Sequence, residues 1–297
     1  HPEKIVAAKT PQPVLVVGAG PAGLECALQL ANRGYEVILS EASKQLGGRV
    51  ISESNLKGLA IWRRVSDYRI YQLQQMDNVN IYLDSALDVQ QVLELGIEHV
   101  FVATGALWRK DGIGRSSRTP ILGLDQVAIY TPDDIMSGVS LGPGPIVIYD
   151  DEQGYLGSVV ADHLSDLGHG VSFVTSASIV SPFTELTLEQ KQVQQGLVAQ
   201  GVGIYTNKTI ASLSQKSGHV GVELKCHYGG EDQWLACASL VLVTERESAS
   251  LLYEQLQQLQ EDNGASSPMP IPMSVTLIGD ALAPGLIADA VFSGHQG

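Results

Sequence analysis

Three glycines near the start of the chain have the spacing of a phosphate-binding turn. Gly18, Gly20 and Gly23 form G-x-G-x-x-G directly after the apolar run 14–17 and at the head of a predicted helix. In such a turn the first glycine permits a tight bend, the second lets the backbone approach a diphosphate, and the third brings helix and strand together. The amino end of the helix adds N–H groups and a partial positive charge. The pattern therefore predicts a site for the diphosphate of a nucleotide.

Glu41 adds a second part to this predicted site. It ends the second apolar strand, 18 residues beyond Gly23. An acidic side chain at this place accepts hydrogen bonds from both ribose hydroxyls and repels a 2′-phosphate. We therefore expect the adenosine ribose of the ligand to be unphosphorylated.

Three shorter motifs follow, namely LGGRV (46–50), VATGA (102–106) and TLIGD (276–280). Their order is typical of flavoproteins with two dinucleotide-binding domains. Arg49 would offer positive charge to a phosphate, and Asp280 would accept a hydrogen bond from a sugar or ribityl hydroxyl. The candidate nucleotide-contacting residues are Gly18, Gly20, Pro21, Ala22, Gly23, Glu41, Ala42, Gly48, Arg49, Thr104, Gly105, Gly279 and Asp280. We predict no catalytic residue and no metal ligand.

A second strand–turn–helix unit begins about 130 residues later, but its turn is acidic. Glu152 stands where the first glycine belongs, Gly154 and Gly157 match the other two, and Asp150 and Asp151 add two carboxylates. Like charges about 4 Å apart cost roughly 1 kcal/mol in water and about 4 kcal/mol at a protein surface. A helix dipole returns typically only about 0.3–1 kcal/mol. We therefore expect this turn to bind no NAD(P)H.

The predicted fold class is α/β, with two Rossmann-like domains of the FAD/NAD(P)-binding type built on parallel sheets. Apolar strands alternate with amphipathic helices in both. We assign residues 1–123 and 244–297 to the nucleotide-binding domain and 124–243 to a degenerate NAD(P)-binding-like domain inserted into it. Residues 219–244 are predicted to form a β-hairpin or meander with its turn at 228–232.

The composition excludes several classes of function. The formal net charge of −14 argues against nucleic acid as a partner. Apolar runs are too short for a membrane span of about 20 residues, so no membrane partner is expected. Three scattered cysteines form no disulfide framework, zinc site or iron–sulfur site, and a reducing cytoplasm is the expected location.

Motifs along the whole chain resemble the carboxy-terminal portion of flavoproteins of the trimethylamine dehydrogenase and histamine dehydrogenase group. That group belongs with the Old Yellow Enzyme and 2,4-dienoyl-CoA reductase-like NADH:flavin oxidoreductases. The matching stretches are HPEKI, GAGPAGLECALQLANRGYEVILSEA, LGGRV, VATGALWRKDG, the acidic IYDDEQGYLG and LIGDALAPGLIADAVFSGH. The resemblance implies an oxidoreductase whose first dinucleotide domain holds ADP as a remnant of FAD and whose second is empty.

The same resemblance implies that FMN and an iron–sulfur cluster belong to an N-terminal flavin barrel that is missing here. The chain is then expected to be a fragment with no amine-oxidising activity of its own. The alternative is an FAD-dependent NAD(P)H oxidoreductase similar to the pyridine nucleotide-disulfide reductases. A third interpretation is a scaffold that binds no ligand.

Overall fold

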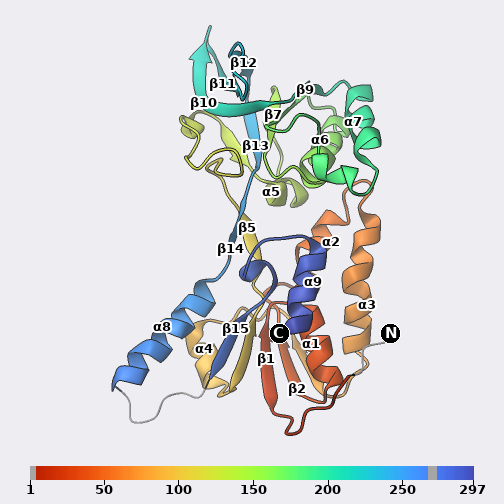
Figure 1. The fold of residues 1–297 in the computed structure, drawn as a ribbon, viewed down its shortest axis with the longest axis vertical. Coiled ribbons are helices and arrows are strands. Elements are labelled where there is room, and N and C mark those ends of the chain that lie inside the picture. The colour runs from red at the N-terminus through yellow and green to blue at the C-terminus, as the bar shows by residue number, and fades with distance from the viewer. Residues whose placement is uncertain (1–4, 267–272) are drawn as a thin grey trace. The chain divides into compact units, whose positions relative to one another are not determined.

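A computed structural model describes residues 5–266 and 273–297 and divides the chain into two compact units (Figure 1). Unit 1 comprises His1–Ser54, Ile61–Leu107 and Glu247–Gly297, and unit 2 comprises Asn55–Ala60 and Trp108–Arg246. The chain changes unit at 54/55 and 60/61, and again at 107/108 and 246/247. The last two changes fall within β5 (Ala106–Trp108) and β14 (Arg246–Ser248), which form a two-stranded sheet. The second unit is therefore inserted into the first, as the sequence predicts.

Unit 1 is built on a five-stranded parallel sheet. In spatial order its strands are β15 (Ser274–Leu277), β4 (His99–Val102), β1 (Pro13–Val17), β2 (Glu36–Ser40) and β3 (Val79–Tyr82). Val14 of β1 lies in register between Val37 and His99. The strand order reverses between β1 and β4, and open α/β sheets bind their ligands at the carboxyl ends of the strands beside such a reversal.

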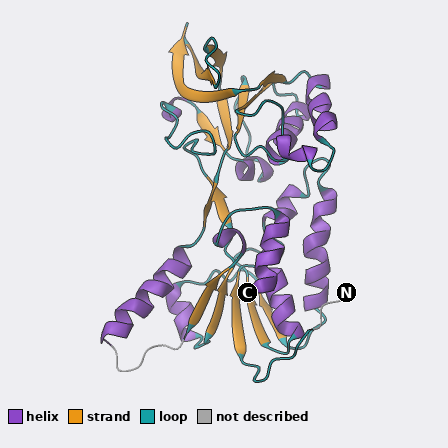
Figure 2. Ribbon diagram, viewed as in Figure 1, coloured by secondary structure: helices purple, strands orange, loops and turns teal. Residues whose placement is uncertain are grey.

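Helices cover both faces of this sheet (Figure 2). One layer contains α1 (Pro21–Asn32), α3 (Arg64–Leu73) and α9 (Ile287–Gln296), and the other contains α4 (Val89–Glu94) and α8 (Leu251–Ser266). Side chains alternate along β1, so that Val14 and Val16 join the core with α1, while Leu15 and Val17 join the core with α4 and α8. Burial on both faces explains why the strand is almost wholly apolar.

A buried ion pair connects the helices of the first layer. Glu25 of α1 accepts hydrogen bonds from Arg69 Nε of α3 at 2.6 Å and from Gln29 Nε2 at 2.8 Å. His295 Nδ1 of α9 lies 3.1 Å from the same carboxylate. Burial alone would raise the pKa of Glu25, but the hydrogen bonds from His295 and Gln29 and the charge of Arg69 together bring it below its ordinary value.

Unit 2 contains a second five-stranded parallel sheet. Its strands, in spatial order, are β6 (Ala128–Tyr130), β13 (Ser239–Val243), β7 (Ile146–Asp150), β8 (Val171–Thr175) and β9 (Gly203–Tyr205). Its helices are α5 (Pro132–Met136), α6 (Leu156–Asp166) and α7 (Gln190–Ala199). Every residue of β7 and β13 is buried, which fits central strands that are covered on both faces.

A three-stranded antiparallel sheet packs on the parallel sheet of unit 2. It consists of β10 (Lys208–Lys216), β11 (His219–Cys226) and β12 (Gln233–Ala236). Ile210, Leu213, Val222 and Leu224 share one core with Val147, Tyr149, Val174, Leu240 and Leu242. The predicted hairpin of residues 219–244 is confirmed for β11 and β12, whereas β13 joins the parallel sheet and β10 adds an unpredicted strand. Together the two parallel sheets confirm the α/β class.

Short elements complete the two units. In unit 1, α2 (Arg49–Glu53) begins within the LGGRV motif, and the 3-10 turn η4 (Gly279–Ala281) follows β15. The 3-10 turn η1 (Ala60–Arg63) precedes α3. Unit 2 has two further 3-10 turns, η2 (Leu124–Gln126) and η3 (Pro182–Glu185). Within the described parts of the chain, no helix is long and apolar enough to cross a membrane.

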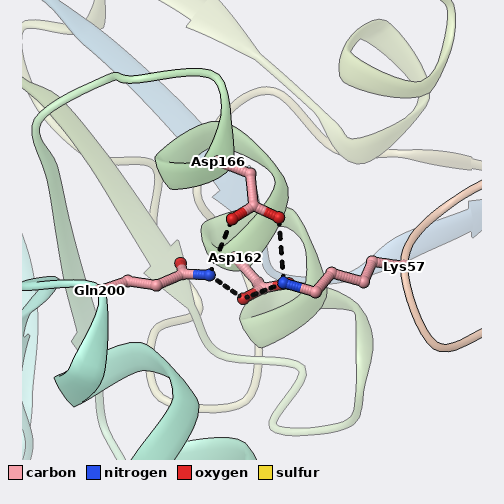
Figure 3. A network of polar contacts seen from close by, with 4 residues as sticks. All are labelled: Lys57, Asp162, Asp166 and Gln200. Carbon is pink, nitrogen blue, oxygen red and sulfur yellow. Dashed lines mark hydrogen bonds and ion pairs between the residues drawn. The ribbon is translucent and has the colours of Figure 1, made fainter.

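The segment between α2 and η1 belongs to unit 2, where Lys57 anchors it to α6 (Figure 3). The Lys57 ammonium lies 3.0 Å from the carboxylates of both Asp162 and Asp166. Gln200, which follows α7, donates to the same two carboxylates. Leu56 is buried directly beside the lysine. This contact between residues more than 100 apart in sequence has no local signal.

The sequence places the domain boundaries at 123/124 and 243/244, whereas the two units divide at 107/108 and 246/247. The difference concerns the Gly-rich connection before residue 124. Ile121 joins the core of unit 2, and Ser116 donates through both its N–H and its hydroxyl to Asp151, at 2.7 and 2.6 Å. These contacts fix the connection on unit 2.

Candidate nucleotide-binding site

The β1–α1 turn has the tight geometry that its glycines predict. Gly18 has a φ of +102°, and an added Cβ there would lie 2.4 Å from the Ala103 carbonyl O. A Cβ on Gly23 would lie 1.9 Å from the Gly18 carbonyl O. Side chains at these two positions would therefore push apart the strand, the turn and the helix. At Gly20, by contrast, an added Cβ would meet no atom within 4 Å, so the middle of the turn has an open face.

The amino end of α1 is directed at this open face. Gly20 is its N-cap and Pro21 its first residue, and no side chain in the described part of the chain caps it. The first N–H groups of a helix have no intrahelical acceptor, and the helix dipole places positive potential there. A diphosphate supplies both the acceptors and the negative charge that such an end lacks.

Glu41 is held at the end of β2 beside the turn. Its Oε2 accepts from the Ala19 N–H and its Oε1 from the Ser43 N–H, both at 2.8 Å. Ala42, between them, lies in the same bend. A carboxylate has about four acceptor positions, so two are left for ribose hydroxyls. The backbone bonds fix the orientation of the carboxylate before any ligand arrives.

The LGGRV motif packs directly over the middle glycine of the turn. The Gly47 N–H donates to the Ala19 carbonyl at 2.8 Å, and an added Cβ on Gly48 would lie 2.9 Å from Gly20 Cα. Arg49 then reaches across: its Nη2 donates to the Ala106 carbonyl at 2.5 Å, and its Nη1 lies 3.9 Å from Asp280 Oδ2.

The two remaining motifs close the same edge of the sheet. The Thr104 hydroxyl donates to the Ala249 carbonyl at 2.6 Å, and the Ala249 N–H donates to the Gly105 carbonyl at 2.9 Å. Asp280 Oδ1 accepts from the Gly285 N–H at 3.1 Å. Thr104 is thus used to hold the backbone of the motif.

All thirteen predicted residues lie in unit 1, beyond the carboxyl ends of β1, β2, β4 and β15 or on the elements that pack there. An added Cβ on Gly279 would lie 2.4 Å from the Cβ of Ala22, which joins the closing motif to the first turn. The sequence did not indicate the parts played by Ala19 and Ala106. Both act through backbone groups, which leave no side-chain signal.

The corresponding turn of unit 2 is filled by its own carboxylates. The N–H groups of Asp151 and Glu152 donate to the Val243 carbonyl at 2.9 and 3.0 Å. The Gln153 N–H donates to Asp150 Oδ1 at 3.0 Å, and the Gly154 N–H to Glu152 Oε2 at 2.9 Å. Four consecutive amides of the turn are therefore bonded within the chain, and a phosphate would have to displace carboxylates to reach the last two.

Asp150 and Asp151 are both fully buried acids of this turn. Asp150 is the one with an unbonded oxygen, because its Oδ2 has no hydrogen-bond partner among the described residues. Burial raises the pKa of Asp150 well above its ordinary value, and the Glu152 and Asp151 carboxylates add to this, against the hydrogen bond from Gln153. Burial in this turn therefore disfavours the charged form of Asp150 relative to the same acid in water.

Comparison with known proteins identifies the family. The sequence pattern of the pyridine nucleotide-disulphide oxidoreductases matches residues 12–266. The chain belongs to this family. Within the residues that the structure covers, no group of three or more His, Cys, Asp or Glu side chains could hold a metal ion.

This oxidoreductase chain is similar to much longer amine-oxidising enzymes. It is 31% identical to dimethylamine dehydrogenase from Hyphomicrobium sp. (strain x), with 100% of the chain and 42% of that protein covered. It is 41% identical to the structure of histamine dehydrogenase from Rhizobium sp. 4-9, with a TM-score of 0.92 and coverage of 100% and 45%. A 6-hydroxypseudooxynicotine amine oxidase from Pseudomonas geniculata N1 gives 40% identity, a TM-score of 0.92 and coverage of 100% and 43%.

The chain thus spans less than half the length of these relatives. The resemblance to the carboxy-terminal portion of the histamine dehydrogenase group is confirmed. The family and the relatives support a flavin- or adenine-nucleotide-binding role for this oxidoreductase chain.

Proposed function

We propose that unit 1 binds ADP as a structural nucleotide, as part of an oxidoreductase similar to the amine dehydrogenases. The observation that carries this proposal is the combination of an uncapped helix end at Gly20 with the fixed carboxylate of Glu41 beside it. The first suits a diphosphate and the second suits the two hydroxyls of an unphosphorylated ribose. ADP would supply binding energy that stabilises the fold and no reacting group, and the chain's own residues would act only in holding it.

The thirteen residues of the predicted site fit such a ligand by their chemistry. Open backbone at Gly20 and Ala22 would receive the diphosphate, and Glu41 would hold the ribose. Unit 2 would keep the dinucleotide-binding shape without the ligand, because its turn amides are bonded internally. FMN and an iron–sulfur cluster would belong to an N-terminal barrel of a parent protein, outside this sequence.

The second candidate is an FAD-dependent NAD(P)H oxidoreductase, which the family match favours. Two observations count against it. The turn of unit 2 offers a dinucleotide the Glu152 carboxylate and amides that are already bonded within the chain. Cys26 and Cys237 are buried, and burial raises the pKa of each thiol to about 12, so neither is a reactive thiolate. The three cysteines are unpaired, which suits the cytoplasmic setting that we propose.

The nucleotide released from the purified chain tests the proposal. The chain is denatured, and the supernatant is analysed by absorbance and mass spectrometry. ADP in a colourless supernatant is the expected result, whereas a yellow supernatant with the mass of FAD would contradict it. If the chain purifies without nucleotide, calorimetric titration with ADP replaces this measurement, and NADH and NADPH are expected not to bind.

Substitution at the ribose position gives a matched test. Glu41→Ala is expected to weaken ADP binding by about 10- to 100-fold, the worth of hydrogen bonds to a charged acceptor. Glu36→Ala, at the exposed opposite end of the same strand, is the control and should leave the affinity unchanged. Equal affinity of the Glu41→Ala variant and the wild type would count against the ribose role.

A further inference from the structure

Residues 55–60 are held on unit 2 by the side chain of one lysine. They follow α2 and belong to unit 2, whereas α2 before them and α3 after them belong to unit 1. The Lys57 ammonium lies 3.0 Å from the carboxylate of Asp162 and 3.0 Å from that of Asp166, one turn further along α6 (Figure 3). Gln200 Nε2 donates to both carboxylates as well. One cation therefore fastens the segment to two anions that a second donor keeps in place.

The short path from α2 to Lys57 has little freedom to bend. Ser54, the C-cap of α2, is bonded back to the helix through its N–H at 2.9 Å and through its hydroxyl at 2.8 Å. Two residues separate this cap from Lys57. Leu56 and Leu59 on either side of the lysine are buried, and the Leu59 N–H donates to the Leu56 carbonyl at 3.1 Å. Because burial or a hydrogen bond holds each step, the position of Lys57 constrains the position of α2.

The other end of α2 lies on the nucleotide turn of unit 1. Gly48 is the N-cap of this helix, and an added Cβ there would lie 2.9 Å from Gly20 Cα. The chain later returns to the same place, where the buried Ser66 hydroxyl of α3 donates to the Gly47 carbonyl at 3.4 Å. Residues 48–65 thus form a loop whose two ends contact the nucleotide turn and its LGGRV motif, while the middle of the loop belongs to unit 2.

We propose that Lys57 is a positioning residue for the nucleotide site: its ion pairs with Asp162 and Asp166 hold α2 so that the Gly48 backbone stays against Gly20. This inference rests on the proposed nucleotide site. Without the ion pairs the loop has more conformations, and ADP binding has to select those in which Gly48 is in place. Because such coupling is reciprocal, ADP bound to unit 1 strengthens the Lys57 contact in unit 2 by the same factor.

The expected effect is modest, because the contact lies at the surface. The side chains of Lys57, Asp162 and Asp166 keep 59%, 21% and 48% of their exposure. Ion pairs with such exposure change an equilibrium by at most about fivefold. Replacing Lys57 by the uncharged Met, which keeps a long apolar side chain, is therefore expected to weaken ADP binding by about two- to fivefold.

Calorimetric titration of the nucleotide-free 297-residue chain with ADP measures this loss. Lys57→Arg should restore the wild-type affinity, because it keeps a cation within reach of both carboxylates. Lys110→Met is the matched control, because Lys110 is 55% exposed and pairs with Asp134 at 2.9 Å elsewhere in unit 2; its ADP affinity should equal that of the wild type. Asp162→Asn combined with Asp166→Asn should weaken ADP binding as much as Lys57→Met, and adding Lys57→Met should cause no further loss.

Hydrogen exchange of residues 55–60 in the wild type is the reciprocal measurement and needs no variant. ADP is expected to slow the exchange of the Leu59 N–H, although this segment belongs to unit 2. Equal ADP affinities of the wild type and Lys57→Met, or exchange that ADP leaves unchanged, would overturn the inference and leave the ADP site intact. An equal loss of affinity in Lys110→Met would also overturn it, because the loss would then come from general weakening of unit 2. A wild type that binds no ADP would contradict the proposed function itself, and this inference with it.

Discussion

Asp150→Asn is expected to stabilise unit 2 at neutral pH, although Asp150 is fully buried. The neutral amide has nearly the shape of the neutral acid, and its oxygen can still accept from the Gln153 N–H. What the substitution removes is the cost of keeping an acid protonated inside the protein when the unfolded chain would ionise it. The variant therefore separates the packing of this residue from its charge.

The magnitude follows from the raised pKa of Asp150. Its ordinary value is 3.8, and the native value lies well above this. A group whose native pKa is raised contributes stability that is present below the unfolded pKa and lost as pH rises toward the native pKa. The loss is about 1.4 kcal/mol for each pH unit within this window. The unfolding free energy of Asp150→Asn should therefore equal that of the wild type near pH 4. Above this pH the variant should gain about 1.4 kcal/mol over the wild type per pH unit, until the pH passes the native pKa of Asp150 and the difference stays constant.

Denaturant unfolding at several pH values between 5 and 8 measures this advantage. Tryptophan fluorescence reports mainly on unit 2, because Trp108 and Trp234 lie in it and Trp62 lies in unit 1. Asp125→Asn, on an exposed position of the same unit, is the control and should give a difference independent of pH. The reasoning would be refuted if Asp150→Asn destabilised the protein at pH 7, or if its effect did not change with pH.

Asp151→Asn provides a contrasting outcome in the same turn. Asp151 accepts from the Ser116 N–H and hydroxyl and from the Ser176 hydroxyl, at 2.6–2.7 Å. An amide would turn an N–H group toward one of these donors, so we expect a loss of about 1–3 kcal/mol at neutral pH. The two neighbouring acids should therefore respond with opposite signs to the same substitution.

Two further substitutions test unit 1. Gly23→Ala should abolish ADP binding and lower the thermal melting temperature. The new methyl group would lie 1.9 Å from the Gly18 carbonyl O, which costs at least about 1–3 kcal/mol in overpacking. A near-normal ADP affinity, measured by calorimetry, would contradict this close approach. Glu25→Gln should cost about 3 kcal/mol at neutral pH, because it leaves the largely buried Arg69 without its counter-charge. The folded chain lowers the pKa of Glu25, so the stabilisation by this carboxylate is present above 4.5, its pKa in the unfolded chain, and is lost as the pH falls through its pKa in the folded chain. A difference in unfolding free energy between variant and wild type that stayed constant from pH 3 to 7 would disprove this.

The first turn of unit 1 is predictable from sequence because its signals are local. Gly18 and Gly23 are required by backbone geometry within six residues, and Glu41 comes at the end of the next strand. The rule that ligands gather at carboxyl ends of parallel strands then places the more distant motifs beside them. What it does not place is Arg49, whose partners lie 57 and 231 residues further along the chain.

Other features of the fold escape sequence analysis for identifiable reasons. β10 is the longest strand, yet its alternation is broken by a register shift between Ile210 and Ser212. Its buried residues Ile210 and Leu213 are therefore three apart, which matches neither side of a regular strand. The boundary near residue 108 likewise depends on Ser116 meeting Asp151, a contact that no local pattern encodes.

The β1–α1 turn of unit 1 and the β7–α6 turn of unit 2 differ in how their backbone N–H groups find acceptors. A strand that leads into a helix in this fold presents unbonded N–H groups and positive potential at a single place. In unit 1 the Ala19 N–H is bonded to Glu41, while Gly20 leaves the helix end beyond it open, so that a ligand can supply the remaining acceptors. In unit 2 Glu152 and Asp150 supply them from within, and the burial of Asp150 raises its pKa well above the ordinary value. Because Asp150 and Glu152 accept from the Gln153 and Gly154 N–H groups, these two amides of the acidic turn have their acceptors within the chain.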